Sequence, residues 1–201
     1  MTMTVGIYIF NEVEVLDFSG PFEVFSTASR VKARLDADMS PLFDVFTLSE
    51  KGAPVLARGG LQIIPRYSIA DHPGIDVLII PGGIVSDELG KEHLISWIKA
   101  STDTAAITAS VCTGAFLLAK AGLLLEKAAT THWEDIDDLA AMFPDIYVKK
   151  DARWVEQGNI VTAAGISAGI DMSLHLVSRL DTMNLAVQTA RQMEYSWNGR
   201  S

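Results

Sequence analysis

Short apolar runs alternate with stretches of helical periodicity along almost the whole chain. The run 76–80, DVLII, is apolar without alternation, which is typical of a strand buried on both faces of a parallel sheet. Similar runs predict strands at 5–10, 43–48, 105–109, 153–155 and 160–162, with shorter pieces around Gly59–Gly60 and at 147–148. Helical spacing predicts helices near 22–28, at 92–102, at 113–124, up to 143, from 165 onwards and at 182–194. This alternation predicts one doubly wound α/β domain over residues 1–201, with a mainly parallel sheet.

Local signals set the ends of some of these elements. Ser19 is the predicted N-cap of the first helix, with Pro21 in its first turn. Gly158–Asn159 predicts a tight hairpin turn between two short strands. Thr182 or Asn184 is the predicted cap of the last helix.

The only cysteine of the chain, Cys112, falls at a predicted strand-to-helix junction. Ser110 stands two residues before it and Gly114 two residues after, the small-residue spacing of a nucleophile elbow. The positive end of the following helix dipole stabilises a thiolate, so we predict a thiol pKa well below the usual value of about 8.5. The alternative is that Cys112 is a small buried hydrophobe.

Three other candidates follow predicted strands or precede helices. Parallel sheets bind ligands beyond the carboxyl ends of their strands, where Asp17 and Gly82–Gly83 are expected to join Cys112. Asp17 is either a functional acid or a helix-entry residue, and Gly82–Gly83 forms either an anion hole or a plain turn. His132 is either a functional residue or a buried structural histidine. No His and acidic residues show metal-ligand spacing.

Composition and net charge limit the classes of molecule that this protein is expected to bind. The chain is 49% hydrophobic and 20% charged, which is ordinary for a globular domain long enough to bury a core. Its formal net charge of −9 argues against nucleic acid or an anionic membrane as a partner. A single cysteine excludes an internal disulfide, and the N-terminus has no basic, signal-like region. We therefore expect a cytoplasmic protein that acts on a small molecule.

Five motifs in order, LDFSGP, IIPGG, VCTG, TTHW and GNIVTAAGISAGIDMSLHL, resemble the DJ-1/PfpI superfamily. Within it, the set is most similar to isocyanide (isonitrile) hydratases. It is also similar to the N-terminal, class I glutamine-amidotransferase-like domains of AraC-type regulators. The resemblance implies a flavodoxin-like three-layer sandwich, usually a homodimer, with a thiolate nucleophile and no cofactor.

Matched motif by motif, the resemblance implies roles for individual residues. Cys112 takes the nucleophile position, and Asp17 takes the acidic position after the first strand. Many DJ-1-like members have glutamate there, so aspartate points toward the isocyanide hydratase branch. His132 matches the histidine that assists the cysteine in other relatives. The backbone N–H groups of Gly83, which follows Gly82, and of Thr113 match the anion-hole positions.

These residues favour a lyase that converts isocyanides to N-substituted formamides through a thioimidate on Cys112, with Asp17 as the proton donor. The alternatives are a PfpI- or DJ-1-like amidase, peptidase or glyoxalase that uses Cys112 with His132, and a ligand- or redox-sensing domain. No basic helix-turn-helix pattern follows Glu194, so we do not expect a complete transcription factor.

Overall fold

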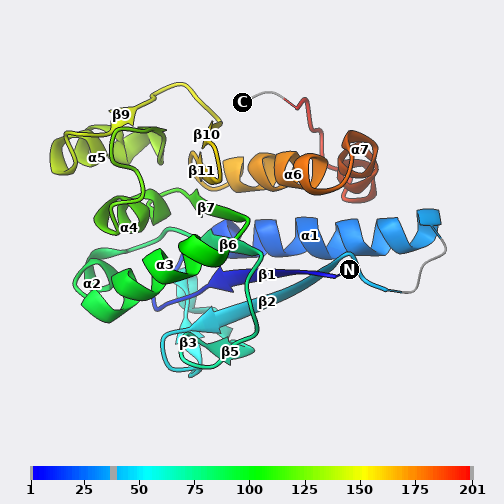
Figure 1. Ribbon diagram of the computed structural model, residues 1–201, viewed down its shortest axis with the longest axis horizontal. Coiled ribbons are helices and arrows are strands. Elements are labelled where there is room, and N and C mark those ends of the chain that lie inside the picture. Colours follow the sequence, from blue (N-terminus) through cyan, green and yellow to red (C-terminus); the bar gives the residue numbers. More distant parts are fainter. Residues whose placement is uncertain (1, 37–39, 200–201) are drawn as a thin grey trace.

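The computed structural model describes residues 2–36 and 40–199. A seven-stranded sheet in the order β10-β11-β7-β6-β1-β2-β5 forms its centre (Figure 1). Neighbouring strands run parallel except for the edge strand β10, which forms an antiparallel hairpin with β11. The strands are β1 (Met3–Tyr8), β2 (Phe43–Ser49), β5 (Tyr67–Ser68), β6 (Val77–Ile80), β7 (Ile107–Val111), β10 (Trp154–Gln157) and β11 (Ile160–Ala163).

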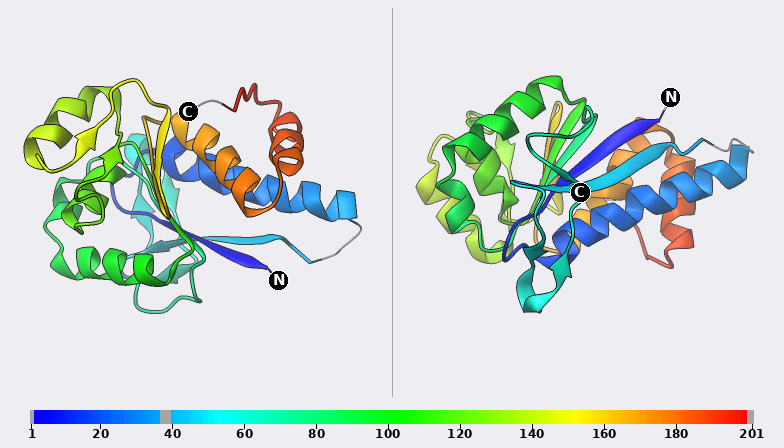
Figure 2. Two further views of the ribbon diagram at one scale, coloured as in Figure 1. Left: turned by 45° about the horizontal axis from the view of Figure 1, so that its top comes forward. Right: turned by 90° about the horizontal axis from the view of Figure 1, so that it is seen from below.

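Helices cover both faces of this sheet (Figure 2). One face carries α1 (Val15–Asp36), α6 (Ala168–Leu180) and α7 (Met183–Gln192), and the other carries α2 (Ser86–Leu89), α3 (Glu92–Thr104), α4 (Gly114–Lys120) and α5 (Ile136–Met142). Every residue of β6, β7 and β11 is buried, because helices exclude water from both sides of these strands. The predicted three-layer α/β arrangement with a mainly parallel sheet is confirmed. None of the described helices is long and apolar enough to cross a membrane.

Smaller elements surround the sheet. Strands β3 (Val55–Leu56) and β4 (Gln62–Ile63) form a hairpin around the 3₁₀ turn Arg58–Gly60. This hairpin is held against the loop after β1, since the Glu12 N–H donates to the Leu56 carbonyl and the Arg58 N–H donates to the Val13 carbonyl. Strands β8 (Ala128–Ala129) and β9 (Tyr147–Val148) pair separately, and a 3₁₀ turn at Trp133–Asp135 precedes α5.

The first helix begins earlier than the sequence predicts. It starts at Val15, so Ser19 lies inside the helix, and its hydroxyl donates to the Val15 carbonyl instead of capping the N-terminus. Pro21 is likewise inside the helix rather than in its first turn. The helix start is fixed from outside, because the Glu14 N–H donates to the Gly82 carbonyl at 2.9 Å. The prediction of a Ser19 cap is therefore wrong, and Asp17 lies in the first helical turn.

Other predicted boundaries agree or shift slightly. Gly158 adopts a positive φ in the expected β10–β11 turn, and the Thr182 hydroxyl caps α7 by accepting the Leu185 N–H. The elbow helix α4 ends at Lys120, earlier than the predicted 124. Gly122 follows with a φ of 75°, a left-handed conformation that commonly ends a helix.

Candidate active site

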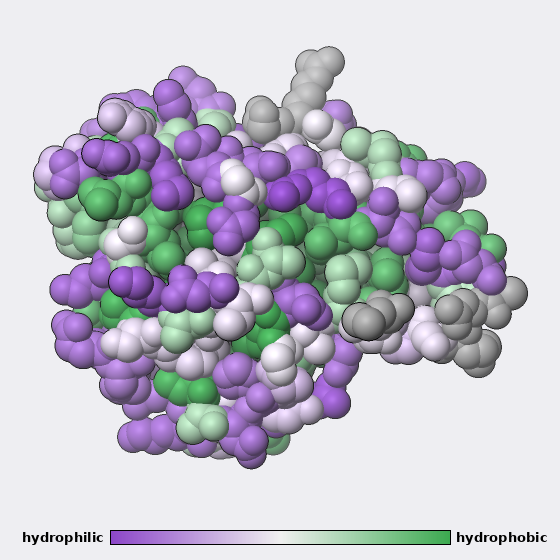
Figure 3. Space-filling view, in the orientation of Figure 1, coloured by the Kyte–Doolittle hydropathy of each residue, from purple (hydrophilic) through white to green (hydrophobic). Residues whose placement is uncertain are grey.

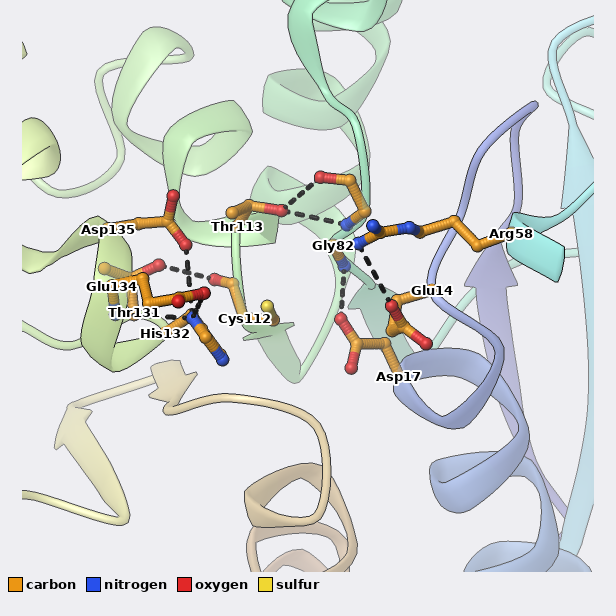
Figure 4. A network of polar contacts seen from close by, with 11 residues as sticks. Glu14, Asp17, Arg58, Gly82, Cys112, Thr113, Thr131, His132, Glu134 and Asp135 are labelled. Atoms are coloured by element: carbon orange, nitrogen blue, oxygen red, sulfur yellow. Dashed lines mark hydrogen bonds and ion pairs between the residues drawn. The ribbon is translucent and has the colours of Figure 1, made fainter.

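The carboxyl ends of β1, β6 and β7 lie side by side, because β6 pairs with both of the others. Asp17 comes after β1, Gly82 follows β6 and Cys112 follows β7. Figure 4 shows the Cys112 sulfur between the Asp17 carboxyl and the segment that carries His132. Asp17, Gly82 and Cys112, which the sequence predicts as site residues, therefore converge at the carboxyl ends of these strands.

Cys112 sits in a strained backbone conformation. Its φ is 56°, in the left-handed region that residues other than glycine adopt at a cost of about 1–3 kcal/mol. Surrounding bonds hold it there: the Cys112 N–H is shared between the Ala163 and Ala164 carbonyls, at 3.2 and 3.1 Å. The Thr131 hydroxyl, from the TTHW segment, donates to the Cys112 carbonyl at 2.9 Å. The expected sharp turn under the thiol is present.

Two glycines allow backbone segments to approach this turn closely. A Cβ on Gly114 would overlap the Ile80 carbonyl oxygen. A Cβ on Gly82 would lie 2.5 Å from both the amide nitrogen and the hydroxyl oxygen of Thr113, closer than real Cβ atoms come. Both positions therefore require glycine for packing. The turn Pro81–Gly82–Gly83 packs directly against Thr113.

Asp17 is completely buried. Its Oδ2 accepts the Gly82 N–H at 3.1 Å, whereas Oδ1 has no hydrogen-bond partner within normal geometry among the described residues. The pKa of Asp17 is raised from 3.8 to about 7, chiefly by burial and in smaller part by the nearby Glu14 carboxylate. The Gly82 N–H and the Cys112 thiol act in the opposite direction, by hydrogen bonding to the carboxylate. Asp17 can therefore hold a proton near neutral pH.

The pKa of the Cys112 thiol differs from the sequence prediction. Its pKa is raised to about 12, chiefly by burial and then by the Asp17 carboxylate, although the Thr113 and Ile166 N–H groups act in the opposite direction by bonding to the sulfur. The seven-residue helix α4 and two amide donors do not outweigh the loss of water around the thiolate. The prediction that the Cys112 thiol has an unusually low pKa is therefore wrong. Cys112 and Asp17 instead form a coupled pair that holds one proton between about pH 7 and 12.

His132 makes its polar contacts with residues of its own segment. Its Nδ1 accepts the Glu134 N–H at 3.3 Å and lies 3.4 Å from Oδ2 of Asp135. The ring packs on Gly165, where any Cβ would overlap it. No hydrogen bond joins His132 to Cys112 within residues 2–36 and 40–199. The contacts fit a wall of the site, and a direct role for His132 stays a prediction.

Of the two amide groups predicted to form an anion hole, that of Gly83 already donates to a protein oxygen. The Gly83 N–H donates to the Thr113 hydroxyl at 2.9 Å, and this hydroxyl donates to the Gly83 carbonyl at 2.8 Å. The donors acting on the sulfur are the Thr113 and Ile166 amides. Ile166 is not among the residues predicted from the sequence; it has a φ of 51°, and its N–H bonds to the thiol. The glycines near Ile166 in the sequence predict tight packing, but they do not predict a positive φ at Ile166 itself.

The site thus offers a nucleophilic sulfur, a carboxyl that can give and take a proton, and two amide donors. This combination suits attack on an electrophilic carbon with proton delivery to the same substrate. Asp135, three residues after His132, was also missed, although an acid at that spacing is a recognisable partner for a histidine. No group of three or more His, Cys, Asp or Glu residues in the described part of the chain is arranged to hold a metal ion.

The pKa of Asp17 predicts how stability depends on pH. The folded protein binds the Asp17 proton more tightly than the unfolded chain, so folding stability falls as pH rises from about 4 to about 7. Asp17→Asn removes this effect and should exceed the wild type in stability at pH 8 by on the order of 2–4 kcal/mol, with the gain vanishing near pH 4. Urea unfolding at both pH values measures it. Asp44→Asn, at an exposed ion pair with Arg66, is the control and should show no gain in stability at pH 8. An equal Asp17→Asn effect at both pH values would contradict the raised pKa.

The chain is similar in sequence both to an enzyme and to transcriptional regulators. The isonitrile hydratase of Pseudomonas putida is 34% identical over 197 residues, covering 98% of this chain and 80% of the enzyme. The HTH-type transcriptional regulator GbdR of Pseudomonas aeruginosa is 26% identical over 193 residues, covering 96% of this chain. This chain spans only half of that regulator's length.

A solved structure agrees with the fold. The crystal structure of a THiJ/PfpI family protein from Pseudomonas syringae superposes with a TM-score of 0.84 at 26% identity, covering 98% of this chain and 76% of the other. The sequence model of the DJ-1/PfpI family matches residues 3–179, which includes Asp17, Gly82–Gly83, Cys112 and His132. The chain therefore belongs to the DJ-1/PfpI family.

Proposed function

We propose that this protein is an isocyanide hydratase, which adds water to an isocyanide to give an N-substituted formamide. One observation carries the proposal: a fully buried aspartate is coupled to the elbow cysteine, so that nucleophile and proton donor act at one point. The resemblance to the isonitrile hydratase of Pseudomonas putida over 98% of the chain supports the same chemistry. The reaction needs no redox step and no cofactor.

The first step uses the proton shared by the pair. Transfer of the thiol proton to Asp17 gives a thiolate beside a carboxylic acid, without any change in the total charge of the pair. The thiolate attacks the terminal isocyanide carbon and forms a carbon–sulfur bond, while Asp17 delivers its proton to the same carbon. The product is a thioimidate on Cys112 and an Asp17 carboxylate.

Hydrolysis then restores the pair. The Asp17 carboxylate takes a proton from water as the hydroxyl adds to the thioimidate carbon, and passes this proton to the nitrogen. Asp17 next accepts the hydroxyl proton as the carbon–oxygen double bond forms and the carbon–sulfur bond breaks. The formamide leaves, and the enzyme again holds a thiolate beside a protonated acid.

Two other functions compete with this one. A cysteine–histidine amidase, peptidase or glyoxalase needs His132 to act on Cys112, yet the contacts of Nδ1 are to Glu134 and Asp135. A ligand-sensing domain is supported by the match to GbdR over 96% of this chain. Turnover of an isocyanide separates the hydratase from a sensor, which binds its ligand without consuming it.

The Asp17 and His132 variants separate the two enzyme mechanisms. Asp17→Asn keeps the side-chain shape but cannot deliver a proton, so kcat/KM for an alkyl isocyanide should fall at least about 10²-fold. His132→Asn should lose less than about tenfold, because no histidine step is needed. Circular dichroism checks that both variants are folded. An Asp17→Asn variant with wild-type activity would refute the hydratase mechanism, and a reversed ranking would favour the cysteine–histidine enzyme.

We also propose that the protein is a homodimer in a reducing, cytoplasmic setting, since the reaction needs a reduced Cys112. Leu16 and Phe22 on α1 and Leu61 and Ile64 beside the β3–β4 hairpin are exposed apolar side chains available for a subunit interface. Light scattering should report about twice the chain mass of 21.8 kDa. Phe22→Glu should weaken the dimer, whereas a fully active wild-type monomer would contradict the proposal.

A further inference from the structure

A groove beside the elbow has apolar walls. Ile84, Val85 and Leu89 line it from the α2 side, and Phe116, Ala141 and Met142 line it from α4 and α5. Its volume is about 540 Å³, within the usual range for small-molecule sites. Figure 3 shows hydrophobic surface on the left of the molecule, in the region of α5 and α2 and bordered by hydrophilic residues. We call this hollow the apolar groove.

The inner end of the apolar groove touches the reaction centre. Thr113, which follows Cys112 directly, lines the groove and donates its N–H to the sulfur. Gly83 also lines it, next to Gly82, whose N–H is bonded to Asp17. When the substrate carbon lies between the sulfur and the Asp17 carboxyl, the substituent of the substrate can therefore extend into the groove.

The charged residues of the apolar groove are acidic. Asp135 and Asp138 line it, and no lysine or arginine among the described residues does so. The nearby cation Lys150 is paired with Asp137, on the same helix as Asp138. Asp138 is exposed and Asp135 is half-buried. Carboxylates beside a groove attract cations and repel anions by an amount that falls with added salt.

A second hollow, of about 450 Å³, differs from the apolar groove in its charged residues. Lys150 and Arg153 line it together with Asp151, whereas the charged residues that line the apolar groove are both aspartates. The two hollows thus differ in the charges that they present to a substituent.

We propose that the apolar groove binds the N-substituent of the substrate and selects for apolar chains with an uncharged or cationic end, against anionic ones. This inference rests on the proposed function, because it assigns the substrate class of that reaction. It makes Phe116, Ala141 and Met142 binding residues and Asp138 the residue that sets charge preference.

Binding of N-hexylformamide, a product analogue, tests the groove without any turnover. Isothermal titration to the wild-type protein should show binding, and Ala141→Phe should weaken it at least about tenfold by filling the space of the chain. Ala140→Phe is the matched control, because Ala140 is the exposed neighbour outside the groove, and it should stay within about twofold of wild type. Equal weakening by both variants, or by neither, would overturn the assignment of the groove.

Charge preference is measured with the ω-ammonium and ω-carboxylate analogues of the same formamide. The ammonium form should bind roughly three- to tenfold more tightly than the carboxylate at low salt. Asp138→Asn should bring this ratio closer to one, and the control Asp137→Asn should leave it unchanged, since Asp137 pairs with Lys150 outside the groove. A carboxylate that binds as tightly as the ammonium would contradict the proposal.

Hydration of methyl isocyanide, followed by formamide release, tests the proposed function separately. Methyl isocyanide has almost no substituent to place in the groove. Absence of this turnover with intact formamide binding would refute the hydratase but keep the groove as a ligand site. Turnover of methyl isocyanide without any effect of chain length or charge would refute the groove and keep the hydratase.

Discussion

The site depends on one constraint: a carboxyl with no exposure to water lies against a buried thiol, and the two cannot both be charged. Burial is the main reason that Asp17 holds its proton to about pH 7 and that the Cys112 thiolate is unfavourable, and neighbouring carboxylates add to both effects. Such an arrangement lowers folding stability at neutral pH. In return, it keeps a mobile proton at the point where a nucleophile and an acid must act together.

The rest of the fold holds this pair in place. The strained φ of Cys112 is maintained by bonds to the end of β11 and by the Thr131 hydroxyl. The turn after β6 is locked to Thr113 through Gly83 and to Asp17 through Gly82, so three strand ends are fixed relative to one another. Rigid supports of this kind allow a strained residue to persist.

Much of this could be predicted from the sequence, because strand ends in a parallel sheet meet at a common edge. That rule alone predicts that Asp17, Gly82 and Cys112 lie close together. The start of α1 was missed, since a contact to Gly82, distant in sequence, fixes it rather than the local Ser19. The direction of the thiol pKa was also missed, because helix dipoles can be read from sequence whereas the depth of burial cannot. The Ile166 amide depends on a backbone angle that its residue type disfavours.

The central claim is that Asp17 and Cys112 titrate as a pair. Carbon-13 NMR of the Asp17 carboxyl carbon and the Cys112 β-carbon, followed against pH, measures both groups directly. In the wild type, the carboxyl should titrate near pH 7, and the thiol should remain protonated until far more alkaline pH. In Asp17→Asn, the thiol pKa should fall, since the neighbouring negative charge is gone. An Asp17 pKa near 4, or a thiol pKa unchanged by Asp17→Asn, would contradict the account.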